Sequence, residues 1–193
     1  MIAVSAYVAK LWFDDYRASR SENPNPRALP GATKAPAGAL VLGAAVILLL
    51  LALETWGEMH LGLTEQQTKM TALFAVYTLC AAVVEEIVFR GFIVWDKGSQ
   101  TMLWASVFGA SLLFAALHPY LWEWKEGKLL GIFTPKGWFS TGSIFVGSLW
   151  FYVCRFAGFN PKRSLLPCFA AHGAKNLGVI LIKATQGFLV GWF

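Results

Sequence analysis

Long apolar runs separated by short polar segments make up most of this chain. Each run is close to the roughly 20 residues that a helix needs to cross the apolar core of a bilayer. The runs are Ala37–Leu53, Met70–Trp95, Met102–Leu117, Thr141–Phe159 and Leu165–Lys183. The pattern predicts an all-α fold, namely a polytopic membrane helix bundle of about five to six transmembrane helices.

The segments outside these runs are predicted to lie at the membrane surface. Met1–Phe13 is apolar but short and contains Lys10, so we expect an interfacial helix rather than a signal peptide. Asp14–Pro36 is a polar linker with four prolines. The chain is therefore divided into an N-terminal interfacial segment and linker, 1–36, and a transmembrane domain, 37–193. We also expect a polar loop over Glu54–Lys69 and an interfacial, Trp-rich segment over Tyr120–Ser140.

Composition supports an integral membrane protein. Hydrophobic residues make up 56% of the chain and charged residues 14%, against about 25% charged in an average soluble domain. The net charge of +5 comes mostly from loops, so anionic lipid headgroups are expected partners and nucleic acid is not. Loops on the side of the N-terminus carry eight Lys and Arg, and the opposite loops carry five. This excess predicts a cytoplasmic N-terminus in a cell membrane. The three cysteines lie in apolar surroundings and are interpreted as buried packing residues.

The second apolar run contains three charged residues, Glu85, Glu86 and Arg90. A charge at the centre of a membrane helix costs about 2.5–3.5 kcal/mol, so such residues indicate a functional site. Glu86 and Arg90 are spaced i,i+4 on one helical face, which favours an ion pair. Glu85 is turned about 100° away and is free to act as a general base. Two alternatives stay open for Arg90: a purely structural pair with Glu86, or a direct contact with a substrate carboxylate.

Further polar residues lie in the third and fifth runs. His118 follows Phe114 by four residues, and His172 precedes Asn176 by four, so each pair shares a helical face. A single membrane histidine can be a packing residue. Two histidines, an amide and a Glu pair together supply a base, oxyanion donors and an orienting pair. Lys175 is interpreted as a snorkelling residue or a neighbour of the site.

The depths of these residues in the membrane present a difficulty. Counted from the inner helix ends, His118 lies about 24 Å along its helix and Glu85 about 15 Å along its own. Either a tilted helix or a third helix that stops at His118-Pro119 inside a wet cavity would bring the two residues level.

Three motifs in this order resemble those of the CPBP family, the CAAX-protease and bacteriocin-processing glutamic intramembrane proteases. Glu85-Glu86-Ile-Val-Phe-Arg90 is similar to its EExxxR motif, Phe114-Ala-Ala-Leu-His118 to its FxxxH motif, and His172-Gly-Ala-Lys-Asn176 to its HxxxN motif. The resemblance covers Met70–Lys183. It implies that 37–193 is an intramembrane-protease domain with its catalytic motifs in 85–176.

The resemblance also implies a role for each motif residue. Glu85 activates water for attack on a peptide carbonyl, and His118 helps to hold that water. His172 and Asn176 stabilise the oxyanion, while Glu86 and Arg90 orient the site. Phe114 and Phe89 are expected to contact the substrate. We expect no metal or cofactor, although Glu85, His118 and His172 could supply the three ligands of a catalytic zinc in an alternative metalloprotease mechanism.

The expected activity is that of an intramembrane endopeptidase acting on a membrane-associated or lipidated protein or peptide. Prenylated C-termini, bacteriocin leaders and sorting signals are all compatible substrates. Two other functions remain open: a non-catalytic binding or immunity protein that uses the same cavity, and a transporter with a Glu–His proton relay. No inverted repeat in the sequence supports the transporter.

Overall fold

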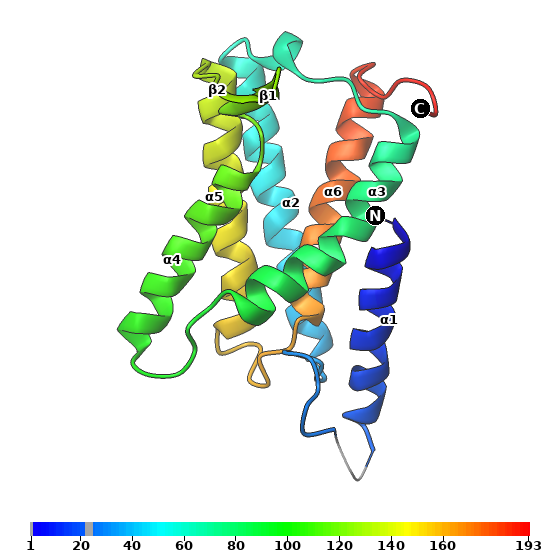
Figure 1. Cartoon of the computed structure of the whole chain (residues 1–193), viewed down its shortest axis with the longest axis vertical. Coiled ribbons are helices and arrows are strands. Elements are labelled where there is room, and N and C mark those ends of the chain that lie inside the picture. The colour runs from blue at the N-terminus through cyan, green and yellow to red at the C-terminus, as the bar shows by residue number, and fades with distance from the viewer. Residues whose placement is uncertain (1, 22–24) are drawn as a thin grey trace.

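The computed structural model, which describes residues 2–21 and 25–193, is a bundle of helices with one small hairpin at its end (Figure 1). The predicted helix bundle is confirmed. The α3 helix continues directly into a π-helical turn, η2, and a short 3₁₀ turn, η1, precedes it. The elements are α1 (Ile2–Ala18), α2 (Ala37–His60), η1 (Thr64–Gln66), α3 (Ala72–Glu86), η2 (Ile87–Phe92), α4 (Gln100–Leu117), β1 (Trp122–Lys125), β2 (Lys128–Gly131), α5 (Pro135–Phe156) and α6 (Leu166–Thr185).

Within the described part of the chain, three helical segments are long and apolar enough to cross a membrane. They are Ala37–His60, Ala72–Phe92 and Gln100–Leu117. The α5 and α6 helices have 22 and 20 residues, which gives them a spanning length at 1.5 Å per residue. They are less apolar than the other three, partly because α6 carries His172, Lys175, Asn176 and Lys183. Of the five to six transmembrane helices predicted, three are therefore supported by both length and composition.

The α2 helix runs past the predicted boundary at Leu53 and ends at His60. The carboxylates that suggested a loop have partners inside the bundle instead. Glu54 lies 3.4 Å from Lys175 of α6, and the buried Glu58 pairs with Lys136 of α5. The helix can continue because these charges are neutralised by neighbouring helices.

The Trp-rich segment after α4 forms an antiparallel hairpin, which the all-α prediction did not include. Strand β1 pairs with β2 from Trp122↔Gly131 to Lys125↔Lys128. Glu126 and Gly127 make the two-residue turn with φ values of 52° and 74°. Positive φ at both turn positions is the geometry that matches the twist of a tight hairpin. The segment is therefore ordered by strand pairing rather than by a helix.

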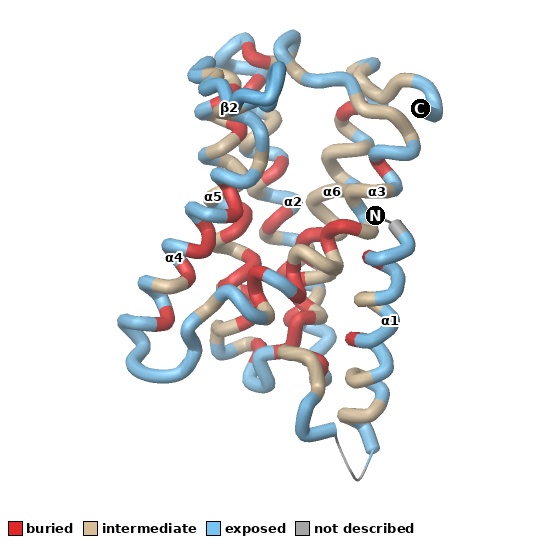
Figure 2. The backbone as a smooth tube through the Cα atoms, in the orientation of Figure 1, coloured by how far each residue is buried: buried red, intermediate tan, exposed pale blue. Residues whose placement is uncertain are grey.

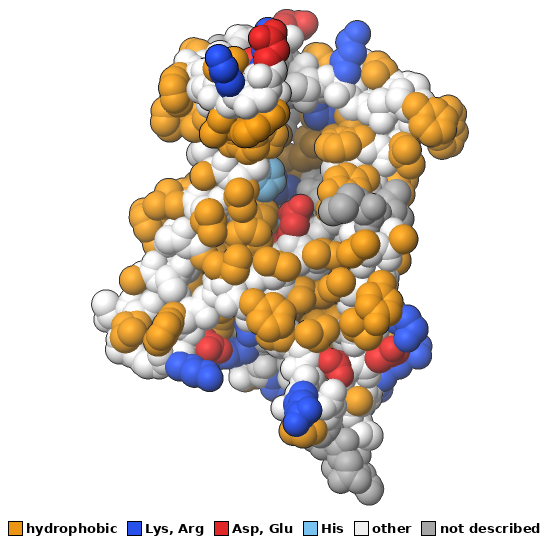
Figure 3. All heavy atoms as spheres, viewed as in Figure 1, with side chains coloured by type: hydrophobic (Ala, Val, Ile, Leu, Met, Phe, Trp, Pro, Cys, Tyr) orange, Lys and Arg blue, Asp and Glu red, His pale blue; other side chains and the backbone are white. Residues whose placement is uncertain are grey.

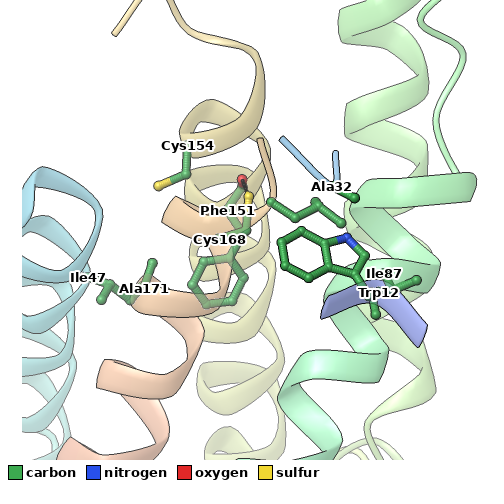
Figure 4. Close-up of a cluster of buried hydrophobic side chains, with 9 residues drawn as sticks. Trp12, Ala32, Ile47, Ile87, Phe151, Cys154, Cys168 and Ala171 are labelled. Carbon is green, nitrogen blue, oxygen red and sulfur yellow. Dashed lines mark hydrogen bonds between the residues drawn. The ribbon is translucent and has the colours of Figure 1, made fainter. Parts of the chain in front are cut away.

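The α1 helix extends beyond the predicted apolar segment, to Ala18, and packs on the bundle through Trp12. The indole of Trp12 is 3% exposed and meets the ring of Phe169 edge-on at 4.8 Å. Its Nε1–H donates to the carbonyl of Pro30 at 3.1 Å. Trp12 thereby joins a core cluster with residues of α2, η2, α5 and α6 (Figure 4).

The most deeply buried residues lie in the middle of the bundle, where η2 passes α5 and α6 (Figure 2). Cys154 and Cys168 are fully buried there as free thiols, which confirms the prediction for these two, whereas Cys80 of α3 is a free thiol that is only half-buried. The α3 helix crosses the bundle obliquely rather than parallel to its neighbours (Figure 1). This crossing determines the depth at which its carboxylates lie.

Candidate active site

The first motif lies at the junction of α3 and the π-helical turn η2. Within this turn the Ile93 N–H donates to the carbonyl of Val88 at 2.9 Å, a five-residue spacing. The Tyr152 hydroxyl of α5 lies 2.8 Å from the Phe89 carbonyl and 3.0 Å from that of Ile93. Such single π-helical turns occur frequently at functional sites. Here the turn presents Arg90 to the interior and is held there by a side chain from another helix.

Glu86 is the central acceptor of the site. Its Oε1 lies 3.1 Å from Nη1 of Arg90 and 2.7 Å from Nδ1 of His172, and the Glu86 and Arg90 side chains are both 0% exposed. The predicted i,i+4 pairing of Glu86 with Arg90 is therefore confirmed. The contact with His172 joins α3 to α6 and fixes the orientation of the imidazole ring.

Within the described part of the chain, the Arg90 guanidinium is surrounded by polar and aromatic side chains. Its Nη2 donates to the Ser148 hydroxyl at 2.7 Å, and Ser148 in turn donates to the Ser111 hydroxyl at 3.1 Å. Four aromatic rings lie within 4.5–5.9 Å of the guanidinium carbon, which is favourable for a desolvated cation. These rings belong to Phe89, Phe114, Phe151 and Tyr152. A fully buried Arg90 cannot reach a substrate carboxylate, so the structure favours the orienting pair.

Glu85 points in a different direction from its neighbour, as its rotation around the helix predicted. Its side chain is 36% exposed, and Oε2 lies 3.7 Å from Nε2 of His172. One side of the molecule is hollowed between apolar rims, and an acidic side chain and an imidazole are visible inside this hollow (Figure 3). Of the two adjacent carboxylates, Glu85 is the one that water can reach.

His118 caps the end of α4 and faces the same site. Its Nδ1 lies 2.8 Å from the Phe114 carbonyl, and its ring centroid is 4.7 Å from that of Phe114. The Phe114 ring also meets that of His172 edge-on, with centroids 6.3 Å apart, so one aromatic side chain contacts both imidazoles. Both arrangements that would bring His118 and Glu85 level are present, because α3 crosses the bundle obliquely and α4 ends with His118 as its C-cap.

Asn176 is on the predicted helix, but its amide contacts the backbone of α3. Its Nδ2 donates to the Thr78 carbonyl at 3.0 Å and so links α6 to α3. The imidazole of His172 stacks on Phe151, with centroids 4.8 Å apart and planes 20° apart. His172 and Asn176 therefore lie on adjoining turns of α6, both oriented by contacts with other helices.

Phe89 and Phe114 pack against each other edge-on at 4.8 Å and are 8% and 4% exposed. Both form part of the enclosure around Arg90. Their expected contact with substrate stays a prediction.

A catalytic zinc would need three side-chain ligands grouped around one point. Nδ1 of His172 is directed at Glu86 and Nδ1 of His118 at a backbone carbonyl. Among residues 2–21 and 25–193, no three His, Cys, Asp or Glu side chains are grouped as a metal site would require. Both Nδ1 atoms and Oε1 of Glu86 are therefore occupied by contacts within the protein.

Several residues of the site were not identified from the sequence, chiefly Ser111, Ser148, Phe151 and Tyr152. Serine and tyrosine occur in many membrane helices, and nothing in their spacing indicates a contact with Arg90. A signal was present for two of them: Ser148 and Tyr152 are spaced i,i+4 inside an apolar run, so their hydroxyl-bearing side chains share one face of the helix.

These features define a helical membrane protein with a buried Glu–Arg–His network beneath an accessible carboxylate. The family described as type II CAAX prenyl endopeptidase Rce1-like matches residues 67–178, which is more than half of the chain and includes all three motifs. The chain belongs to this peptidase family and is an integral membrane protein. Comparison with curated proteins and with solved structures finds no match.

Proposed function

We propose that this protein is a glutamic intramembrane endopeptidase that hydrolyses a peptide bond with a water molecule activated by Glu85. The observation that carries the proposal is the contrast between two adjacent carboxylates. Glu86 is fully buried against Arg90 and His172, whereas Glu85 is one-third exposed beside Nε2 of the same imidazole. The buried, ion-paired carboxylate of Glu86 suits an orienting group. The accessible carboxylate of Glu85 suits a general base.

The reaction would proceed by addition of water to the peptide carbonyl. Glu85 takes a proton from the water as its oxygen bonds to the carbonyl carbon, and negative charge develops on the carbonyl oxygen. Collapse of this intermediate breaks the C–N bond, and the proton held by Glu85 passes to the departing amine. The carboxylate is regenerated, so one water is consumed for each bond cleaved.

The remaining motif residues stabilise the charge that develops. Glu86 accepts from Nδ1–H of His172, so Nε2, which lies on the side of Glu85, donates to the oxyanion in the doubly protonated imidazolium form. Asn176 retains a second amide N–H beyond the one bound to Thr78. A preorganised oxyanion donor typically contributes about 3 kcal/mol of transition-state stabilisation. His118, whose Nδ1 is occupied by the Phe114 carbonyl, is placed to hold the water through Nε2.

No metal is required by this scheme, and a zinc-dependent mechanism with the same residues is the alternative. The ligands of that alternative would be Glu85, His118 and His172, and within residues 2–21 and 25–193 these three side chains do not form a group that could hold one ion.

The substrate is proposed to be a membrane-associated or lipidated protein or peptide, and the family description makes a prenylated C-terminal peptide the first one to test. Of the eight basic residues on the side of the N-terminus, six lie in loops, and Arg17 and Arg155 lie in the last turns of α1 and α5; these loops and helix ends share one end of the bundle (Figure 1). The excess of these eight basic residues over the five at the opposite end supports a cell-membrane protein with this end in the cytoplasm.

A turnover assay tests the proposal against a non-catalytic binding role. The purified protein is reconstituted in liposomes with a quenched-fluorescence peptide that carries a farnesylated cysteine three residues from its C-terminus. We expect repeated cleavage per protein molecule, with one ¹⁸O atom from labelled water in the new carboxylate. Stoichiometric peptide binding without any product would contradict the proposal.

A further inference from the structure

Lys175 is a membrane cation whose role the proposed mechanism leaves unexplained. It lies on α6 between His172 and Asn176, three residues after the first and one before the second. Its side chain is 13% exposed, and its spacing of three residues from His172 places it on the same side of α6 as that imidazole. A lysine at this position places a positive charge beside the reacting groups.

The Lys175 ammonium has unused donor capacity. Its one ion-pair partner in the described part of the chain is Glu54 of α2, at 3.4 Å from Nζ to Oε2. This separation exceeds the 2.7–2.9 Å of a charge-assisted hydrogen bond. Within residues 2–21 and 25–193, no hydrogen bond of the ammonium is formed, although it has three N–H donors.

The fold makes room for this ammonium. Gly147 of α5 faces Lys175, and a Cβ atom at that position would lie 3.2 Å from Nζ. A side chain on α5 would therefore crowd the ammonium. The ammonium therefore lies between α5, from which Gly147 faces it, and α2, which supplies Glu54.

The other motif-associated cation cannot bind an external anion. Arg90 is fully buried and enclosed by Glu86, Ser148 and aromatic rings. Lys175 is partly exposed and only loosely paired. Of these two cations, Lys175 alone can exchange its partner for an incoming carboxylate.

We propose that Lys175 binds the free C-terminal carboxylate of the substrate, an inference that rests on the proposed function and names its substrate class. Glu54 keeps the ammonium in place while the site is empty. Lys175 lies about 4.5 Å from His172 along the α6 axis. An extended peptide advances about 3.3–3.6 Å per residue, so the carboxylate would follow the cleaved bond by only a few residues.

The test compares one farnesylated quenched-fluorescence peptide in two forms, with a free C-terminal carboxylate and with a carboxamide. We expect the wild-type KM to be about 10- to 100-fold lower for the acid, the range for a hydrogen bond to a charged group. Lys175→Met should raise the KM of the acid to that of the amide and leave the amide KM unchanged. Glu54→Gln, which removes the competing carboxylate, should lower the KM of the acid.

Lys69→Met is the matched control, because Lys69 is an exposed lysine outside the membrane helices, and it should change neither value. Equal wild-type KM values for acid and amide would overturn the inference while leaving the proposed function intact. So would a Lys175→Met variant that raises both KM values equally, because that result indicates a structural role.

If neither peptide is cleaved, the proposed function fails for this substrate class, and binding then decides the inference separately. The affinity of the two peptides for detergent-solubilised wild-type protein is measured by fluorescence anisotropy. Tighter binding of the acid, abolished in Lys175→Met, would support the carboxylate subsite, and equal binding would refute it.

Discussion

Replacing Arg90 by methionine should destabilise the bundle far more than removing an exposed arginine. The substitution keeps an unbranched apolar side chain among the four aromatic rings and removes the guanidinium that neutralises Glu86. Breaking a buried ion pair on one side typically costs about 3–5 kcal/mol, because the remaining charge stays buried without its partner. At about 2–4 °C per kcal/mol for a chain of this size, the melting temperature should fall by about 6–20 °C.

Arg163→Met is the matched control for this prediction. Arg163 pairs with Asp96 at 3.7 Å, and both side chains are more than one-third exposed. Exposed pairs of this kind contribute about 1 kcal/mol or less. We therefore expect the control to melt within a few degrees of the wild type, although it too loses one arginine.

A double-mutant cycle separates the ion pair from general packing. Glu86→Gln with Arg90→Met removes both charges, so the double variant should be more stable than the sum of the single effects predicts. Thermal melts of the wild type, both single variants and the double variant in the same detergent give the coupling energy. We expect a coupling of about 2 kcal/mol or more. Effects that add within about 0.5 kcal/mol would refute the assignment of a coupled pair.

Other predictions concern the surroundings of Arg90 and the chemistry of the site. Ser148→Ala removes the 2.7 Å contact with Nη2 and should cost about 1.5–3 kcal/mol of stability; a stability equal to that of wild type in thermal melts would contradict this. Tyr152→Phe loses the hydroxyl that holds the π-helical turn and should lower kcat more than it raises KM, whereas a change in KM alone would argue against a positioning role. Strong chelators should leave cleavage unchanged; one zinc per chain, with activity lost on its removal and restored on its return, would establish the metal-dependent alternative.

Contacts within one helix could be predicted from the sequence, whereas contacts between helices could not. The Glu86–Arg90 pair and the separate direction of Glu85 follow from 3.6 residues per turn, which is fixed whatever the bundle does. The contact of His172 with Glu86 joins residues 86 positions apart and depends on how α3 and α6 pack. The motif resemblance brought these residues into one site, but only the structure assigned Glu86 rather than Glu85 as the buried partner of the imidazole.

The depth of His118 shows why spacing along a helix is an incomplete guide. Counting residues from a helix end treats every helix as parallel to the membrane normal. The α3 helix crosses obliquely and ends in a π-helical turn, and neither feature has a reliable signal in the sequence. The ion pairs of Glu54 and Glu58 were missed for a related reason, because a polar residue near the end of an apolar run resembles a loop until its partner on another helix is known.

The most direct test of the account is the cleavage rate of Glu85→Gln, measured beside Glu65→Gln, which changes an exposed carboxylate at the end of the bundle. Glutamine keeps the size of Glu85 and cannot take a proton from water. We expect Glu85→Gln to melt like the wild type and to lose about 10²–10⁴-fold in kcat, the usual contribution of a general base, while Glu65→Gln keeps full activity. A Glu85→Gln variant that retains more than about a tenth of the wild-type rate would contradict the central claim that this carboxylate activates the attacking water.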